Sequence, residues 1–102
     1  MKFSAIGKPA GCKLIRLDAE VEKGVLVAIS IRGDFFAIPE EGFERAESRL
    51  PGTRVTDLAV RLTQLMKEEG VEPYGISGEG LAEVLIAGME AGMKGAGDGA
   101  SA

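Results

Sequence analysis

A cysteine next to a lysine is the residue pair in this sequence that comes closest to reactive chemistry. Cys12 stands between Gly11 and Lys13. A lysine beside a thiol favours the thiolate and flexible glycine neighbours favour access, so a sulfur-carrying or redox role for Cys12 is chemically feasible. The alternative is a lone cysteine without a role, which cannot form an internal disulfide.

The chain contains no histidine, which excludes most familiar catalytic groups. The common Cys/His zinc sites and the Ser–His and Cys–His nucleophile pairs all need an imidazole. The run Gly75-Ile76-Ser77-Gly78-Glu79 therefore has no base for a nucleophile elbow, and it lacks the last glycine of that motif. Ser77 is better interpreted as a helix cap. We predict no catalytic residue, no cofactor ligand and no metal ligand in this chain.

Two adjacent phenylalanines follow a glycine and an acid. Phe35 and Phe36 come directly after Arg32-Gly33-Asp34, a tripeptide known from cell adhesion. Here we interpret it as the end of a strand, where Gly33 frees the backbone to turn and Asp34 can hydrogen-bond locally. Neighbouring side chains of an extended chain point to opposite faces. One ring is therefore predicted to be buried, and the other to be exposed in an interface.

Length, composition and charge limit what these residues can serve. The chain has 102 residues, of which 45% are hydrophobic and 27% charged, so we expect one globular core. Sixteen acidic and twelve basic residues give a net charge of -4 without a basic face, which argues against a nucleic-acid partner. No apolar run approaches the ~18 residues of a membrane span or forms a signal-peptide core, so we expect no membrane partner and a cytoplasmic protein.

Strands are predicted in the first third of the chain. Residues 14–21 and 25–32 alternate between apolar and polar side chains, as half-buried strands do, and residues 2–6 can add an edge strand. A three-residue loop at 22–24 gives the hairpin a register in which apolar residues face one another. That register pairs Val21 with Val25, Ala19 with Val27, Leu17 with Ile29 and Ile15 with Ile31.

Two amphipathic helices are predicted after the strands. Pro39 is expected in the first turn of the first helix, where its missing N–H would be unpaired anyway, and Pro51-Gly52 ends that helix. The second helix is expected to begin with Thr53 or Thr56 as its N-cap and to run to Gly70.

A third helix is predicted after a loop at 72–75. Ser77 would cap it, and a stripe of residues from Leu81 to Gly92 would face the core. Strands followed by helices favour an α+β fold, with a small antiparallel sheet, made of a hairpin and an edge strand, packed against about three helices. The Gly/Ala-rich residues 94–102 have little to bury and are predicted to be flexible. We therefore predict one domain at 1–93 and a tail at 94–102.

Two stretches of this sequence resemble a known family. They are the run 8–17, Lys-Pro-Ala-Gly-Cys-Lys-Leu-Ile-Arg-Leu, and, beyond the hairpin, the run 31–41, which contains the Gly-Asp-Phe-Phe corner. Together they resemble the C-terminal accessory domain of lipoate–protein ligases, which also has a capped helix near its end, similar to Gly75-Ile76-Ser77. The resemblance covers most of residues 8–90. Cys12 departs from the pattern, because the family has glycine before Lys-Leu.

The resemblance implies a role as one part of an enzyme. In one-chain ligases this domain follows a larger catalytic domain that makes lipoyl-adenylate, and in some prokaryotes the two are separate proteins that are both needed. This chain looks like the separate small subunit, with the catalytic subunit as its partner and lipoyl-domain proteins as indirect partners. Lipoate, ATP and magnesium would be bound by the catalytic subunit rather than by this chain. The candidate interface or motif residues are Lys13, Gly33, Asp34, Phe35 and Phe36.

Two other functions remain open from the sequence. One is a sulfur-transfer or iron–sulfur scaffold-like protein that uses Cys12, since the fold of the accessory domain resembles that of such proteins. The other is a small binding domain for some other partner.

Overall fold

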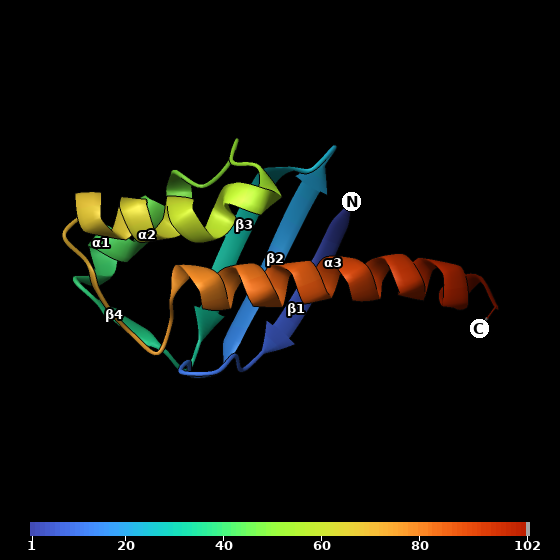
Figure 1. The fold of residues 1–102 in the computed structure, drawn as a ribbon, viewed down its shortest axis with the longest axis horizontal. Helices are drawn as coiled ribbons and strands as arrows, with labels where there is room; N and C mark the ends of the chain where they lie inside the picture. The colour runs from blue at the N-terminus through green and yellow to red at the C-terminus, as the bar shows by residue number, and fades with distance from the viewer. Residues whose placement is uncertain (102) are drawn as a thin grey trace.

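The computed structural model describes the backbone of residues 1–101 and the side chains of residues 1–92 (Figure 1). The described residues form a three-stranded antiparallel sheet, a two-stranded sheet and three α-helices, which confirms the predicted α+β class. None of these helices is both long enough and apolar enough to cross a membrane. In chain order the elements are β1 (Lys2–Gly7), β2 (Ile15–Glu22), β3 (Val25–Gly33), β4 (Phe36–Ile38), α1 (Glu40–Ser48), the 3-10 helix η1 (Val55–Asp57), α2 (Leu58–Glu68), β5 (Glu72–Tyr74) and α3 (Gly78–Ser101).

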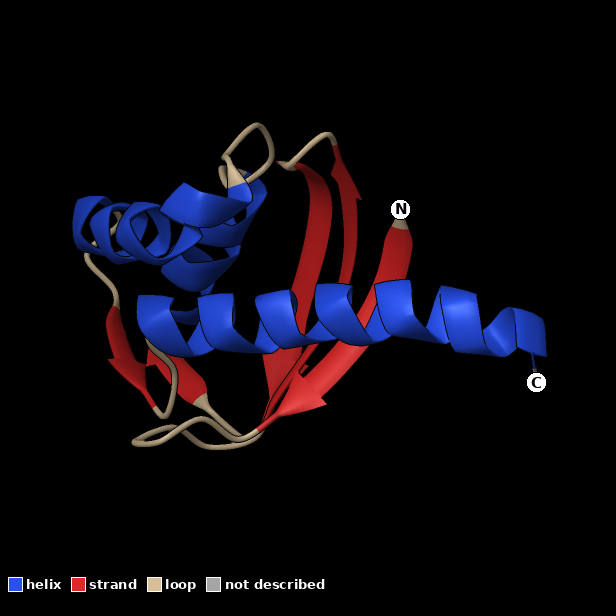
Figure 2. Cartoon of the chain, turned by 45° about the vertical axis from the view of Figure 1, so that its right-hand side comes forward, coloured by secondary structure: helices blue, strands red, loops and turns tan. Residues whose placement is uncertain are grey.

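One face of the three-stranded sheet carries the core. The strand order is β1-β2-β3, and α3 crosses the face that is directed toward the helices (Figures 1 and 2). The alternating sequence of β2 places its side chains as predicted: the apolar ones are buried, and the charged ones between them are not. The side chains that are almost fully buried include Ile15, Leu17, Leu62, Leu65, Leu81 and Leu85.

The turn between β2 and β3 corrects the predicted hairpin. It has two residues rather than three, Lys23 and Gly24, both in the left-handed region with φ of 52° and 75°. An extra residue in β3, Val27, forms a bulge and moves the pairing by one position, so that Leu17 faces Ile31 rather than Ile29. The bulge thus gives the apolar pairing for which a longer loop had been expected.

For each of the three helices the sequence predicts which residue lies at the N-terminus and in which position, and the structure confirms this for one of them. Pro39 is the N-cap of α1 rather than part of its first turn, because its ψ of 149° is extended, and its peptide bond with the preceding residue is cis. Neither Thr53 nor Thr56 caps α2, because the η1 turn comes first. Ser77 caps α3 as predicted, since its Oγ accepts a hydrogen bond of 3.0 Å from the N–H of Gly80.

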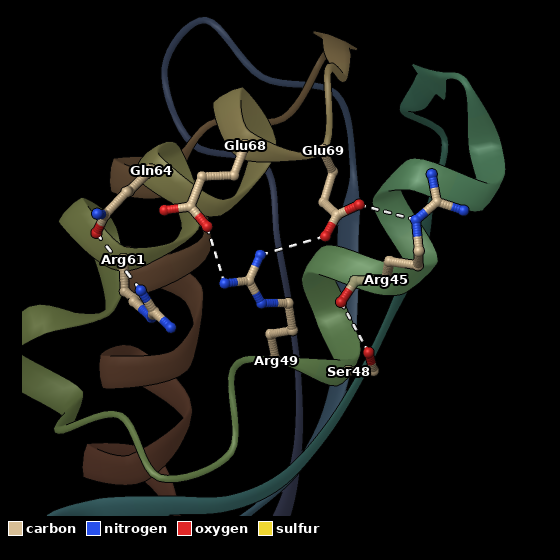
Figure 3. Close-up of polar contacts among 7 residues, drawn as sticks. All are labelled: Arg45, Ser48, Arg49, Arg61, Gln64, Glu68 and Glu69. Carbon is tan, nitrogen blue, oxygen red and sulfur yellow. Dashed lines mark hydrogen bonds and ion pairs between the residues drawn. The ribbon is translucent and has the colours of Figure 1, made fainter.

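Ion pairs join the ends of α1 and α2 (Figure 3). The guanidinium of Arg49 lies 2.8 Å from the carboxylate of Glu68 and 3.2 Å from that of Glu69, and Arg45 Nε donates to Glu69 at 2.8 Å. The hydrogen bond from Arg45, together with Arg49, lowers the pKa of Glu69. Because these pairs are exposed to solvent, each adds little to the packing of α1 on α2.

The two-stranded sheet corrects the loop that was predicted at 72–75. Residues 72–74 form β5, which pairs antiparallel with β4 so that Phe36 faces Tyr74 and Ile38 faces Glu72. The pairing joins segments more than thirty positions apart, and β5 is three residues long. Neither strand therefore had a periodic pattern in the sequence.

The end of α3 overlaps the segment that was predicted to be flexible. The backbone of α3 continues as a helix to Ser101, past the end of the predicted domain at 93. The side chains of residues 94–102 lie outside the described residues, so the division between domain and flexible tail remains a prediction.

Candidate partner-binding site

The chain leaves β3 at a corner that requires glycine. Gly33 has a φ of 154°, and a Cβ there would lie 2.1 Å from the carbonyl oxygen of Leu14. The N–H of Asp34 donates a hydrogen bond of 2.9 Å to the same oxygen. Leu14 and the corner are thus in direct backbone contact, which fixes the direction in which the next two residues leave the sheet.

The two phenylalanines separate as the alternation predicts. Phe35 packs against the core, and its ring lies 5.5 Å from that of Phe43 at an angle of 55°. Phe36 is 59% exposed. The structure therefore assigns Phe35 to the core and leaves Phe36 on the surface.

Phe36 belongs to an apolar surface on the two-stranded sheet. Ile38 and Tyr74 are 55% and 44% exposed, and the rings of Phe36 and Tyr74 stack with their centroids 4.9 Å apart. We call Phe36, Ile38 and Tyr74 the β4–β5 patch. The hydroxyl of Tyr74 donates to Glu72 at 2.7 Å, and this bond to a carboxylate raises the pKa of the phenol.

An acidic groove adjoins the β4–β5 patch. It lies between the end of β3 and α1, and its lining includes Phe36, Glu40, Glu44 and Glu47. Glu47 is half-buried, and its carboxylate accepts a hydrogen bond of 2.7 Å from the N–H of Ile31. Burial raises the pKa of Glu47 and repulsion from Glu44 adds to this effect, whereas the hydrogen bond from Ile31 acts in the opposite direction.

Arg32 also lines the groove, but its charge is already paired. Its Nη2 lies 2.8 Å from the carboxylate of Asp18, a residue of β2. Asp18 also accepts a hydrogen bond from Ser4, and this bond, with that from Arg32, lowers the pKa of Asp18. The groove therefore keeps an excess of negative charge.

Lys13 lies beside the end of β5. Its N–H donates a hydrogen bond of 2.8 Å to the carbonyl of Gly75. Gly75 has a φ of 87°, and a Cβ there would lie 2.5 Å from Lys13 Cγ and 3.3 Å from Phe35 Cβ. The structure thus brings Lys13 and the phenylalanine corner to the same region, with the lysine side chain exposed.

Cys12 is not accessible, contrary to the expectation from its glycine neighbours. Only 9% of it is exposed, and its Sγ lies 3.7 Å from the Oγ of Ser77. A Cβ at Gly80 would come within 2.6 Å of this sulfur. Within the described part of the chain, no three His, Cys, Asp or Glu side chains form a group that could hold a metal ion. Cys12 is thus a core residue that packs against the start of α3.

A solved structure has the same fold over most of the chain. It comes from an archaeal lipoylation system of Thermoplasma acidophilum, described as a bipartite lipoate protein ligase and its E2 lipoyl domain. The similarity covers 83% of this chain and 94% of the other, with 27% sequence identity and a TM-score of 0.68. The resemblance to the lipoate–protein ligases is confirmed. No family model and no curated protein matches the sequence.

Phe36 belongs both to a sequence motif that carries the ligase resemblance and to the β4–β5 patch. The Gly-Asp-Phe-Phe corner ends in Phe36, which is the first residue of β4. Sequence reasoning missed Ile38 and Tyr74, because their exposure together with Phe36 depends on the pairing of β4 with β5. The only signal available was the aromatic character of Tyr74, the one tyrosine of the chain.

Proposed function

We propose that this chain is the accessory subunit of a two-part, cytoplasmic lipoate–protein ligase. A separate catalytic subunit would need it for the ATP-dependent activation of lipoate to lipoyl-adenylate, and so for protein lipoylation. The supporting observation is the similarity to a component of a bipartite ligase system, which covers 83% of this chain and 94% of the other. The exposed β4–β5 patch offers a surface for such a partner.

An accessory subunit can act without catalytic groups of its own. A protein that binds the active conformation of its partner more tightly than the inactive one shifts the partner toward activity. Moving such an equilibrium from 1:99 to 99:1 needs a differential affinity of about 10⁴-fold. In this proposal the catalytic subunit binds lipoate, ATP and magnesium, and this chain contributes binding energy alone. Lipoyl-domain proteins are then modified by the complex.

A mixing experiment tests the proposed function. This chain and a candidate catalytic subunit are incubated separately and together with lipoate, ATP, magnesium and an apo lipoyl domain. Adenylate formation is followed by lipoate-dependent exchange of pyrophosphate into ATP, and transfer by the mass of the lipoyl domain. An unrelated acidic protein of similar size replaces this chain in the control.

The proposal expects this chain alone to form no lipoyl-adenylate and to raise the activity of the catalytic subunit well above its background. Two results would overturn it. One is adenylate formed by this chain by itself, and the other is a catalytic subunit whose activity is the same with this chain as with the control protein.

A further inference from the structure

The outer face of the β4–β5 sheet is apolar and uncovered. In β4 the middle residue is buried, while Phe36 and Ile38 on either side of it are exposed. Their cross-strand neighbours are Tyr74 and Glu72, so three of the four side chains in these two pairs are apolar. A face of this composition is typical of the centre of a protein–protein interface, where aromatic residues are enriched.

The β4–β5 patch is too small to be a complete interface. Phe36 and Tyr74 are 59% and 44% exposed, which together corresponds to about one aromatic side chain, or roughly 150–250 Å². Ile38, which is 55% exposed, adds about half of an aliphatic side chain. A stable interface buries about 800 Å² on each partner. A partner that covers the patch must therefore also cover the residues around it.

Acidic side chains outnumber basic ones around the patch, where Lys13 beside the end of β5 is an exposed basic residue. Glu72 belongs to the same two-stranded sheet, and Glu40 and Glu44 line the groove beside Phe36. Arg32, which also lines this groove, is paired with Asp18. The whole chain carries a net charge of -4. A partner surface with basic groups around an apolar centre complements this arrangement.

A second copy of this chain fits the patch poorly. In a twofold symmetric dimer the same surface is used on both subunits. The rim carboxylates of one copy would then lie near those of the other, and like charges facing one another cost several kcal/mol. Charge complementarity thus favours a different, basic partner.

We infer that the β4–β5 patch is the anchor by which this chain docks on the catalytic subunit, and that the catalytic subunit presents there an apolar pocket surrounded by arginine and lysine. The inference rests on the proposed function and adds to it the surface and its chemistry. Phe36 and Tyr74 fill the pocket. Glu40 and Glu72 face the basic rim, where they increase the rate of association more than the final affinity.

Binding measurements with matched variants test this inference. The affinity of this chain for the catalytic subunit is measured by calorimetry for the wild type, Phe36→Ala, Tyr74→Ala and the control Val60→Ala. Val60 is 73% exposed on α2, and it belongs neither to the β4–β5 patch nor to the lining of the acidic groove. Removal of an interface anchor is expected to weaken binding by about 30-fold, equivalent to ~2 kcal/mol, whereas the control should bind like the wild type.

The role of the acidic residues Glu40 and Glu72 is tested separately, by the rate of association. The double variant Glu40→Gln, Glu72→Gln should associate more slowly than the wild type at low ionic strength, and its association rate should depend less on salt. Stopped-flow or surface-based kinetics at several salt concentrations measures this. Circular dichroism melting of each variant alone shows whether it is folded, and a variant that does not fold is replaced by the other aromatic substitution.

The outcomes separate this inference from the proposed function. If the wild type binds and activates the catalytic subunit but Phe36→Ala and Tyr74→Ala bind equally well, the docking surface is wrong and the function stands. If the wild type neither binds nor activates, both are wrong. If the wild type is a dimer by light scattering and Phe36→Ala is a monomer, the occupant of the patch is a second copy, which also overturns the inference.

Discussion

Replacing Phe35 with alanine tests the division of two adjacent rings between core and surface. Phe35 packs on the core and contacts Phe43 with the ring centroids 5.5 Å apart. Truncating a buried phenylalanine to alanine costs ~3–5 kcal/mol, and because Phe35 is only partly buried we expect about 3 kcal/mol. A domain of this size has a total stability of about 5–15 kcal/mol. The variant should therefore lose a large share of its stability.

The expected change in melting temperature follows from this value. For a domain of about 100 residues each kcal/mol shifts Tm by roughly 4–8 °C, so Phe35→Ala should melt ~12–24 °C below the wild type. Phe36→Ala is the matched control. Phe36 is 59% exposed, and its loss removes mainly the stack with Tyr74, which corresponds to about 1 kcal/mol and a shift of about 4–8 °C.

Thermal melting of the isolated chain, followed by circular dichroism of the helices, measures both shifts. The assignment of the two rings is refuted if Phe36→Ala lowers Tm as much as Phe35→Ala does. It is also refuted if Phe35→Ala melts within about 4 °C of the wild type, which would correspond to less than ~1 kcal/mol.

Three further predictions concern the packing of α3, the carboxylate at the edge of the sheet and the buried thiol. Gly78→Ala should lower stability by about 3 kcal/mol in urea denaturation, because its Cβ would lie 2.1 Å from a backbone carbonyl oxygen of α2. Gly92→Ala should not be destabilising, because its Cβ would lie 3.0 Å from the flexible end of the Met1 side chain and 4.0 Å from Phe3 Cβ. Glu47→Ala should cost about 1–3 kcal/mol because it leaves the N–H of Ile31 without its partner, whereas Glu47→Gln keeps an acceptor. The raised pKa of Glu47 means that the folded protein binds the proton more tightly than the unfolded chain, so its contribution to stability is present at low pH and lost as the pH rises through the raised pKa. Glu47→Gln should accordingly gain stability relative to the wild type as the pH rises from about 4.5, the ordinary value for this carboxyl, through its raised pKa. A difference in urea denaturation that stays constant with pH would contradict this. Cys12→Ser should leave ligation by the complex nearly unchanged per folded molecule, and a persulfide on Cys12 in mass spectra of protein from cells would contradict the assignment of this thiol to the core.

The elements that could be predicted are those in which a local pattern and burial agree. In β2 the alternation of apolar and charged residues corresponds directly to buried and exposed positions. Ser77 caps α3 because a hydroxyl at that position satisfies a free N–H of the first turn, which depends on a few consecutive residues only. Such features need no knowledge of distant parts of the chain.

The hairpin shows why register is harder to predict. In two regular strands, a two-residue Lys23-Gly24 loop would pair the apolar Leu17 with the polar Ser30, and this conflict favours the three-residue loop. The bulge at Val27 removes this conflict while the short Lys23-Gly24 turn is kept. A bulge has no strong signal in the sequence here, because Val27 is as apolar as its neighbours and yet is 45% exposed.

Only part of the candidate site could be predicted from the sequence, for a different reason. One exposed ring could be predicted at 35–36, because adjacent side chains of an extended chain point to opposite faces, but the sequence does not show which of the two it is. Ile38 and Tyr74 join it only through the pairing of β4 with β5, which is non-local and involves strands of three residues. A proline in β5 also argued for a loop.

Hydrogen bonds along the outer edge of β3 restrict how a partner can bind to this side of the protein. The N–H of Leu26 donates a hydrogen bond of 2.8 Å to the carbonyl of Thr53, and its carbonyl accepts one of 2.7 Å from the N–H of Gly52. The N–H of Ile31 donates to the carboxylate of Glu47. An incoming strand would have to displace these groups before it could extend the sheet there. Recognition on this side of the molecule must consequently proceed through side chains, so its selectivity can change by single substitutions while the backbone of the sheet stays the same.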